Sequence, residues 1–507
     1  MAYLLGIDVG TSGTKAALFT PQGETLATVT VEYSLSQPQN GWAEQNPTDW
    51  WVAVCTGIKR IITSLRLDPA EIKGIGLAGQ MHGLVMLDRE GEVLRPAIIW
   101  CDQRTTRETE ELAERIGSER IISLTANPAM FSFTAARVLW VQRHEPHLYE
   151  CCAHILLPKD YIRFKLTGEF ATEVSDASGM QLMDVAKRCW SAEILDKLGI
   201  SQEQLGVLRE SQEVTGKVHA TAALETGLAE GTIVVGGAAD NAAAAIGMGV
   251  IQPDSALATL GSSGVILALS DELVIDYQGR IHSLCAAVPG KWTVMSCTQA
   301  AGLSLKWFRD QFCQDLITTG LQENTDPYRL MDCLAAEVEP GALGLIFLPY
   351  LMGERSPHPD PDCRGVFFGL SAMHTRGHLI RAVMEGVAFS QKECVDVFAQ
   401  LGIALQELRV CGGGYRSLLW RQMLADLCAC RVTLSEANEG PALGAAILAS
   451  VGAGIYRDLE QACEQMVRPG ASITGSLQNQ IAYQSSYDLY RNLYPALAGS
   501  FTELSRL

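Results

Sequence analysis

The sequence lacks the cysteine patterns of disulfide-bonded and zinc-binding proteins. Its 15 cysteines are spread over 507 residues, their number is odd, and no two form a Cys-x-x-Cys pair. This distribution favours reduced thiols, most of them buried, in a cytosolic protein. Cys151-Cys152 and Cys428-Ala429-Cys430 are the closest groups, and for both a core role is favoured over metal binding.

Positive charge is also scarce. The chain has 39 Lys and Arg against 57 Asp and Glu, which gives a formal net charge of −18. Nucleic acids and anionic membranes attract basic surfaces, so this balance argues against both as partners. The Gly-x-x-x-x-Gly-Lys-Ser/Thr phosphate loop is missing as well. A bound nucleotide would therefore need local hydrogen-bond donors and a metal ion.

No apolar run is both long enough and pure enough to cross a membrane. The most apolar stretch, residues 232–251, is interrupted by Asp240 and Asn241. We interpret it as a buried strand, a polar turn and a helix of small residues. The first residues, Met1-Ala2-Tyr3, lead directly into a predicted strand. We therefore expect no signal peptide and a cytoplasmic location.

Two short stretches about 250 residues apart repeat one pattern. Residues 7–18 and residues 258–269 each join two apolar runs through Gly-Thr-Ser-Gly or Gly-Ser-Ser-Gly. The pattern predicts two β-hairpins with hydroxyl-lined tips. Glycine allows a close backbone approach, and consecutive N–H groups form a concave anion site. One such tip is weak support for anion binding, whereas two predict a duplicated fold that holds a polyphosphate from both sides.

The length of the chain indicates more than one domain. Strands alternate with helices in both halves, which indicates the α/β class with two similar halves. We place one domain at residues 1–247 and a second at residues 248–455. A helical segment at residues 456–507 is expected to pack back on the first domain through a stripe of tyrosines. The stripe consists of Tyr483, Tyr487, Tyr490 and Tyr494.

Seven motifs follow one another in the order known from one family. They are GIDVGTSGTK (6–15), GQMHG (79–83), LPKDY (157–161), GAADNAA (237–243), LPYLMGER (348–355), GVFFGL (365–370) and GGGYRS (412–417). In these motifs the chain resembles the FGGY family of carbohydrate kinases over essentially its whole length. One departure is Arg137, near which the family signature has a lysine; the positive charge is kept.

The resemblance implies a duplicated actin-like, ribonuclease-H-like fold with ATP in the cleft between two domains. It also implies phosphoryl transfer to a sugar, with Asp240 as the general base and Asp8 holding Mg²⁺ through water. Without the resemblance, Asp240 would be interpreted as the cap of the following helix and Asp8 as a turn residue.

The same resemblance assigns three groups of binding residues. Residues implied for the phosphates are Thr11, Ser12, Gly13, Lys15, Gly261, Ser262, Ser263 and Gly264, although Lys15 alone would fit a solvated strand edge. Residues implied for adenosine are Gly413, Gly414 and Ser417, although glycines there would also suit a simple turn. Residues implied for the sugar are Met81, His82, Trp100, Asp102, Asp240 and Asn241, although a lone His in a loop and a core Trp are common.

The function expected from these residues is ATP-dependent phosphorylation of a ketopentose, with D-xylulose favoured. Ribulose, a deoxyketose or a polyol are alternative acceptors. An ATP-binding sugar sensor or an actin-like assembly protein are alternatives from other classes. The presence of both Asp8 and Asp240 favours catalysis over a silent sensor. The expected partners are the sugar and ATP, and the family allows a homodimer.

Overall fold

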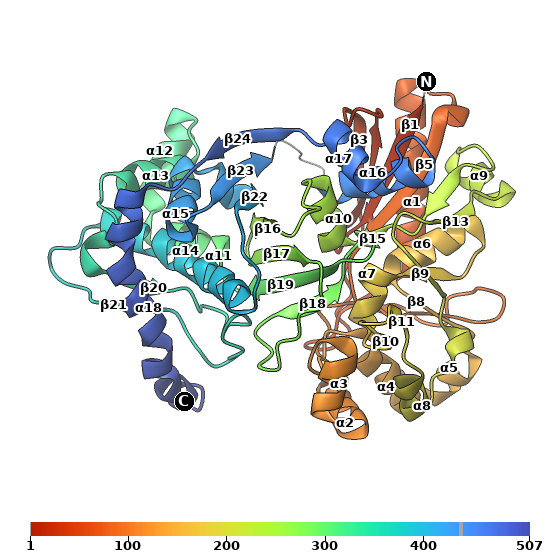
Figure 1. The fold of residues 1–507 in the computed structure, drawn as a ribbon, viewed down its shortest axis with the longest axis horizontal. Coiled ribbons are helices and arrows are strands. Elements are labelled where there is room, and N and C mark those ends of the chain that lie inside the picture. The colour runs from red at the N-terminus through yellow and green to blue at the C-terminus, as the bar shows by residue number, and fades with distance from the viewer. Residues whose placement is uncertain (1, 436–439) are drawn as a thin grey trace.

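The computed structural model describes residues 2–435 and 440–507. Two lobes lie side by side (Figure 1), and each is built on a seven-stranded mixed sheet with helices around it. This arrangement confirms the predicted α/β fold with two similar halves. Among the described residues, no helix combines the length and the apolar character needed to span a bilayer.

The first sheet has the strand order β13-β14-β5-β1-β2-β3, with β15 added to β5. β1, β2 and β3 form the predicted antiparallel meander, and β5 runs parallel to β1. The strands are β1 (Tyr3–Val9), β2 (Gly13–Phe19), β3 (Thr25–Glu32), β5 (Ile72–Gly79), β13 (Val214–Lys217), β14 (Ile233–Val235) and β15 (Ala238–Ala239).

The second sheet repeats this plan in the order β18-β19-β17-β16-β22-β23-β24. β16 and β17 form the second hairpin, and β22 runs parallel to β16 as β5 does to β1. The strands are β16 (Ser255–Leu260), β17 (Gly264–Ser270), β18 (His282–Cys285), β19 (Trp292–Thr298), β22 (Glu407–Cys411), β23 (Arg431–Ser435) and β24 (Pro469–Ile473).

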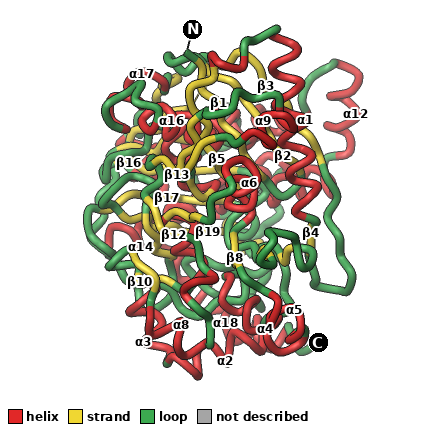
Figure 2. Tube along the Cα trace, turned by 90° about the vertical axis from the view of Figure 1, so that its right-hand side faces the viewer, coloured by secondary structure: helices red, strands yellow, loops and turns green. Residues whose placement is uncertain are grey.

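Helices cover both faces of the first sheet because apolar residues of β1 alternate between them. Leu5 and Ile7 face a core shared with α1 (Pro47–Leu65) and α6 (Pro158–Thr167), whereas Leu4 faces a core shared with α16 (Gly440–Gly452). Figure 2 shows α1 and α6 with α9 (Ala220–Thr226) on the outer side of this lobe.

Helix α16 lies very close to the first sheet, as its small residues predict. A Cβ atom on Gly6 would lie 1.9 Å from the carbonyl oxygen of Ala442, and one on Gly76 would lie 1.8 Å from that of Ala445. α16 also packs against α10 (Asp240–Gly247), the helix that carries the predicted base. Glycine at these positions therefore permits the helix to approach the strands.

Short elements fill the rest of each lobe. Those of the first lobe are β4 (Glu44–Gln45), β6 (Val85–Leu87), β7 (Ala97–Ile98), α2 (Thr106–Ile116), α3 (Ser118–Thr125), α4 (Thr134–His144), α5 (Pro146–Cys151), β8 (His154–Leu156), β9 (Ala171–Glu173), α7 (Val174–Ala177), β10 (Met183–Asp184), β11 (Cys189–Trp190), α8 (Ala192–Leu198) and β12 (Val207–Arg209). Those of the second are α11 (Gly302–Phe312), α12 (Gln314–Glu323), α13 (Pro327–Ala336), β20 (Ile346–Leu348), β21 (Val366–Phe368), α14 (Arg376–Gln400) and α15 (Leu418–Cys428).

The prediction that the tyrosine stripe packs on the first domain is wrong. α17 (Leu459–Met466) does pack on the first lobe beside α16, but α18 (Leu477–Leu504) lies against α14 and α15 of the second lobe (Figure 1). Tyr483 OH accepts a 2.6 Å hydrogen bond from Arg381, and Tyr490 OH lies 3.3 Å from Tyr350 OH. The physical reason is β24, which carries the chain to the edge of the second sheet before α18 begins.

Strand β18 belongs to the second sheet but is bound to the first lobe. The buried Asn127 side chain donates to the Ser283 carbonyl at 2.7 Å and accepts from the Ser283 N–H at 3.2 Å. Ser178 Oγ accepts a further hydrogen bond from the Cys285 N–H at 3.1 Å. The lobes are therefore joined along β18.

Candidate active site

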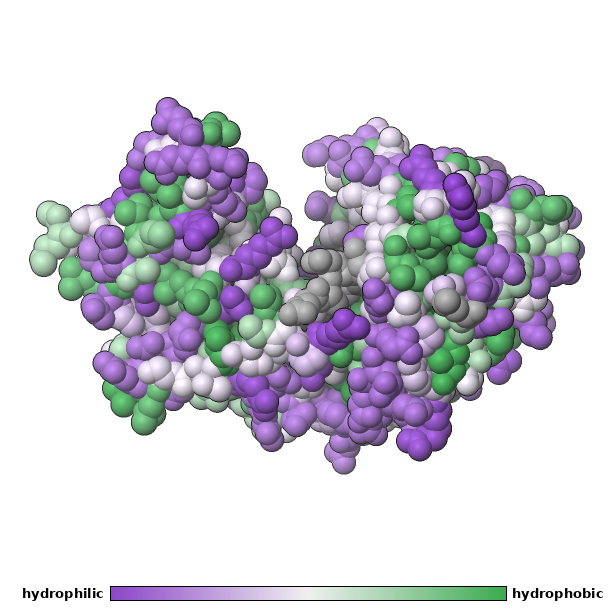
Figure 3. Space-filling model, turned by 90° about the horizontal axis from the view of Figure 1, so that it is seen from above, coloured by the Kyte–Doolittle hydropathy of each residue, from purple (hydrophilic) through white to green (hydrophobic). Residues whose placement is uncertain are grey.

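A cavity of about 300 Å³ lies between the lobes and is lined by residues of both. The space-filling view shows the molecule hollowed between its two lobes (Figure 3). Of the residues predicted to bind the sugar, Met81, His82, Trp100, Asp240 and Asn241 line the cavity. The second lobe contributes Ser263 of its hairpin tip together with His282, Gln299 and Arg355.

Asp240 is the first residue of α10 and follows directly on β15. Burial, and to a lesser extent the negative charge of Asp8, raise the pKa of its carboxyl to about 7, against the opposing effect of the Asn241 N–H. That N–H donates to Asp240 Oδ1 at 2.7 Å. A carboxylate with a pKa near neutrality is suited to accept a proton from a hydroxyl at physiological pH.

Asp8 lies opposite Lys15 in the β1–β2 pair, next to the first hairpin tip. Its negative charge is one of the causes that raise the pKa of Asp240. Among the described residues, no group of three or more His, Cys, Asp or Glu side chains could hold a metal ion. Carboxylates as few as those of Asp8 and Asp240 fit Mg²⁺, which commonly takes one or two carboxylates and completes its shell with water and phosphate oxygens.

His82 is held in one orientation at the cavity wall. Its backbone has a φ of 66°, in the left-handed region, and its ring stacks on Phe133 with centroids 4.2 Å apart. Nδ1 lies 2.9 Å from the Gly179 carbonyl oxygen, which can only accept, so Nδ1 carries the proton and Nε2 is an acceptor. Burial lowers the pKa of His82 to about 3, which keeps the ring neutral.

The buried Arg137 supports the loop that carries His82. Its guanidinium donates to the carbonyl oxygens of His82 at 2.7 Å, Ser132 at 2.6 Å and Ile99 at 3.1 Å. A planar guanidinium with five donors can serve three carbonyls at once, which a lysine ammonium cannot do with the same geometry. The departure noted in the sequence therefore concerns the backbone of the loop that carries His82.

Trp100 and Asp102 have different positions, although both were predicted to contact the sugar. Trp100 lines the cavity, is 38% exposed, and donates from Nε1 to Thr11 Oγ1 at 2.9 Å. Asp102 is fully buried and does not line the cavity. Its carboxylate accepts from the Ala43 N–H and from Arg104, so the predicted sugar contact is wrong for Asp102.

A buried ionic cluster lies behind Asp240. Lys159 Nζ lies 2.8 Å from Asp160, 3.2 Å from Glu173 and 3.3 Å from Asp176, and all four side chains are almost completely inaccessible to solvent. Glu173 accepts from Ser175 Oγ at 3.0 Å. The motif at 157–161 carries Lys159 and Asp160. Their partners Glu173 and Asp176 lie outside this motif, so the sequence did not predict the cluster.

Each hairpin tip is closed by a hydrogen bond from its first glycine, but the first tip is one residue longer than the second. The Gly10 N–H donates to the Gly13 carbonyl at 3.1 Å, and the Gly261 N–H donates to the Ser263 carbonyl at 3.0 Å. Ser263 lines the cavity between the lobes, whereas Gly261 and Ser262 line a second pocket. The second hairpin thus separates the two pockets, as a phosphate-binding element between nucleotide and sugar would.

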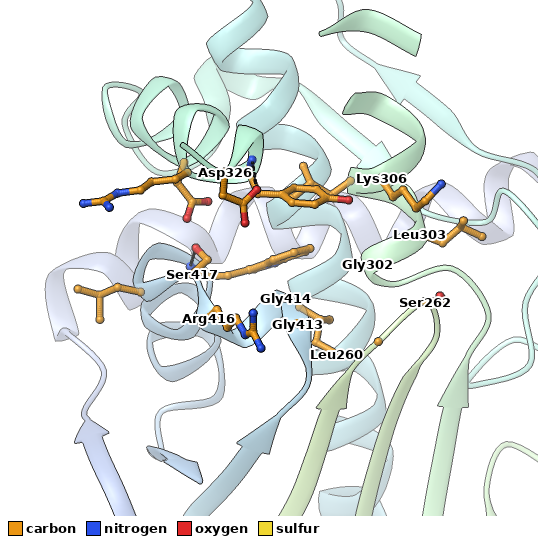
Figure 4. Close-up of a pocket in the computed structure, with 17 residues that line it drawn as sticks. Leu260, Ser262, Gly302, Leu303, Lys306, Asp326, Gly413, Gly414, Arg416 and Ser417 are labelled. Atoms are coloured by element: carbon orange, nitrogen blue, oxygen red, sulfur yellow. Dashed lines mark hydrogen bonds between the residues drawn. The ribbon is translucent and has the colours of Figure 1, made fainter. Parts of the chain in front are cut away.

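The second pocket has a volume of about 660 Å³ and lies within the second lobe. The predicted residues Gly413, Gly414 and Ser417 line one side. Figure 4 shows Asp326 and Lys306 across the pocket from these residues. A Cβ atom on Gly414 would lie 2.1 Å from Leu260 Cδ2, so glycine is required there for packing as well. Asp326 and Lys306 were not predicted, because they belong to no recognised motif.

Comparison with known proteins gives one consistent family. Residues 3–247 match the N-terminal domain, and residues 256–453 the C-terminal domain, of the FGGY family of carbohydrate kinases. The chain is 38% identical to xylulose kinase of Bacillus subtilis, covering 97% of each chain. It is 39% identical to xylulose kinase of Escherichia coli, covering 97% of this chain and 99% of that protein.

A solved structure shows the same similarity. The crystal structure of xylulose kinase from Rhodospirillum rubrum superposes with a TM-score of 0.91 at 32% identity, covering 99% of this chain and 100% of the other. Together with the matched domain models, these relatives show that the chain belongs to the FGGY family of carbohydrate kinases.

Proposed function

We propose that the protein transfers the γ-phosphoryl group of ATP to the C5 hydroxyl of D-xylulose, forming D-xylulose 5-phosphate and ADP. The observation that carries the proposal is the position of Asp240. It shares one cavity with His82 of the first lobe and with Ser263 of the second hairpin. The relatives named as xylulose kinases support the choice of acceptor.

Transfer of the phosphoryl group to the sugar is accompanied by transfer of a proton from the sugar to Asp240. Its carboxylate accepts the proton of the C5 hydroxyl as that oxygen attacks the γ-phosphorus, and the bond between phosphorus and ADP breaks. Backbone N–H groups and hydroxyls of the two hairpins stabilise the charge on the phosphoryl oxygens. Mg²⁺, when bound beside Asp8, supplies further charge neutralisation.

In this proposal one lobe binds most of the sugar and the other binds adenosine. Residues 1–247 hold most of the sugar, with His82 and Asn241 as hydrogen-bonding groups. Residues 248–455 hold adenosine at Gly413, Gly414 and Ser417. We further propose that the protein acts in the cytoplasm, where its 15 cysteines, all free in the structure, remain reduced.

An ADP-release assay over a panel of pentuloses, polyols and aldonates tests this function. D-Xylulose is expected to give the highest kcat/KM. A higher value for ribulose or a polyol would move the assignment to that acceptor within the same family. Failure to phosphorylate any member, with ATP binding retained, would refute the catalytic proposal in favour of a sensor.

A further inference from the structure

Arg355 brings a positive charge into the sugar cavity from the second lobe. It is the only Arg or Lys among the described residues that line this cavity. Across the part of the chain that the structure describes, its guanidinium makes no ion pair and no hydrogen bond. Placing a guanidinium in a partly enclosed site costs free energy unless a ligand supplies acceptors.

The backbone of Arg355 is held in place by a buried carboxyl group. Glu354, which is 4% exposed, accepts through Oε1 from the backbone N–H groups of Arg355 and Gln299, each at 2.8 Å. Gln299 also lines the cavity. One buried carboxyl thus sets the positions of two cavity residues that lie 56 positions apart in the sequence. Such support is typical of a group whose placement matters for binding.

Arg355 belongs to the wall of the cavity that carries His82. Ser356 Oγ donates at 2.8 Å to the backbone carbonyl two residues before His282. The ring centroid of Phe133 lies 4.2 Å from that of His82 and 6.3 Å from that of His282. The charge of Arg355 also lowers the pKa values of both histidines, whose rings are kept neutral chiefly by burial. A ketopentose whose C5 hydroxyl meets Asp240 would extend its C1 hydroxyl and C2 carbonyl toward that wall.

We propose that Arg355, positioned by Glu354, determines specificity by receiving the carbonyl end of the ketopentose. This inference rests on the proposed function. A guanidinium has only donors and a carbonyl oxygen has only acceptor sites, so the two are complementary. A hydroxyl at the same place would carry a proton for which the guanidinium offers no acceptor. A carboxylate at the same end of a sugar acid would match as well. An alditol, which carries a hydroxyl in place of the carbonyl, would be bound less well.

Binding of D-xylulose and of xylitol, measured by calorimetry without ATP, tests the proposal directly. Arg355→Gln is expected to weaken D-xylulose binding by about tenfold to a hundredfold, the range of a hydrogen bond to a charged group. Xylitol binding should change much less, so the preference of the wild type for the ketose should nearly vanish. The KM for ATP should stay within about twofold, because the nucleotide pocket is separate.

Two further variants separate specificity from structure. Arg364→Gln is the matched control, since Arg364 is exposed and donates only to the carbonyls of Pro361 and Cys363. Glu354→Gln keeps an acceptor for both N–H groups and should bind nearly as the wild type does, whereas Glu354→Ala should resemble Arg355→Gln.

An unchanged preference for D-xylulose over xylitol in Arg355→Gln would overturn the inference, as would an equal loss for both ligands. These outcomes are distinct from failure of the proposed function. If the wild type phosphorylated no sugar, the proposed kinase function would be refuted. The calorimetric comparison of D-xylulose and xylitol would still decide the role of Arg355.

Discussion

Ser175 Oγ accepts a hydrogen bond of 3.1 Å from the backbone N–H of Ala239, the residue that precedes Asp240. Ser175 in turn donates to Glu173, which lies 3.2 Å from Lys159 Nζ. The backbone next to Asp240, the proposed base, is thus connected to a fully buried ionic cluster. Asp240 takes its position from this connection as well as from the strand and helix that it joins.

Replacing Asp240 by Asn is expected to abolish phosphoryl transfer while ATP binding is retained. The amide has nearly the shape of the carboxyl but cannot accept the proton at neutral pH. Sugar phosphorylation and ATP binding should be measured on the same preparation. Turnover within about tenfold of the wild type would exclude Asp240 as the base.

The same variant is expected to unfold at a higher temperature than the wild type at pH 8. The folded-state pKa of Asp240 is raised from 3.8 to about 7, so folding disfavours its ionised form. Stability is therefore lost as pH rises from about 4 through about 7. The gain in Tm for Asp240→Asn should shrink toward pH 4, and an equal gain at both pH values would contradict this cause.

The pH dependence of kcat/KM for the sugar should show an acid limb near pH 7. The base must be ionised, so activity rises as pH increases through the raised pKa of Asp240. Asp8→Asn removes a negative charge that raises this pKa, so the limb of its residual activity should move to lower pH. A limb that stays in place would show that Asp8 does not act on the base electrostatically.

Replacing Lys159 by Met is expected to destabilise the protein by about 3–5 kcal/mol, the usual cost of removing one partner from a buried ion pair. The change leaves the buried carboxylates of Asp160, Glu173 and Asp176 without this cation. Urea unfolding measures the effect. The exposed Lys187, which pairs with Asp184, offers a control, since Lys187→Met should change stability by less than about 1 kcal/mol.

Substituting Gly76 by Ala is expected to disrupt the packing of α16 on β5. The new methyl group would lie 1.8 Å from the Ala445 carbonyl oxygen, and backbone atoms cannot yield as a flexible side chain can. A marked fall in Tm or loss of soluble protein should result. Gly499 of α18 has nothing within 4 Å of its Cβ position, so Gly499→Ala should stabilise the helix by roughly 0.5–1 kcal/mol.

Local patterns predicted the parts of the fold that depend on local chemistry. The two hairpins and the strand-to-helix turn at Asp240 follow from apolar runs separated by glycine and polar residues. The position of α18 did not follow, because its partner depends on the course of β24. Burial of Asp102 was missed for a related reason, since its binding by Ala43 and Arg104 arises only from tertiary packing.

Several residues of the two pockets gave no signal of their own. Lys306 of α11 and Asp326, the N-cap of α13, are far apart in sequence from η5 (Gly413–Arg416) and lie around one pocket with it only in the folded chain. Arg355 lies in a motif that supported the family resemblance, but nothing in that motif indicates that its side chain reaches the cavity between the lobes. Contacts between lobes are set by the fold as a whole and are therefore invisible to a local pattern.

Strand β18 is the element through which the two lobes are joined. It is held to the first lobe through Asn127 and Ser178, and it also carries His282 of the sugar cavity. The wall of the cavity at His282 is therefore fixed from both lobes, because β18 pairs with β19 in one lobe and is hydrogen-bonded by Asn127 and Ser178 in the other.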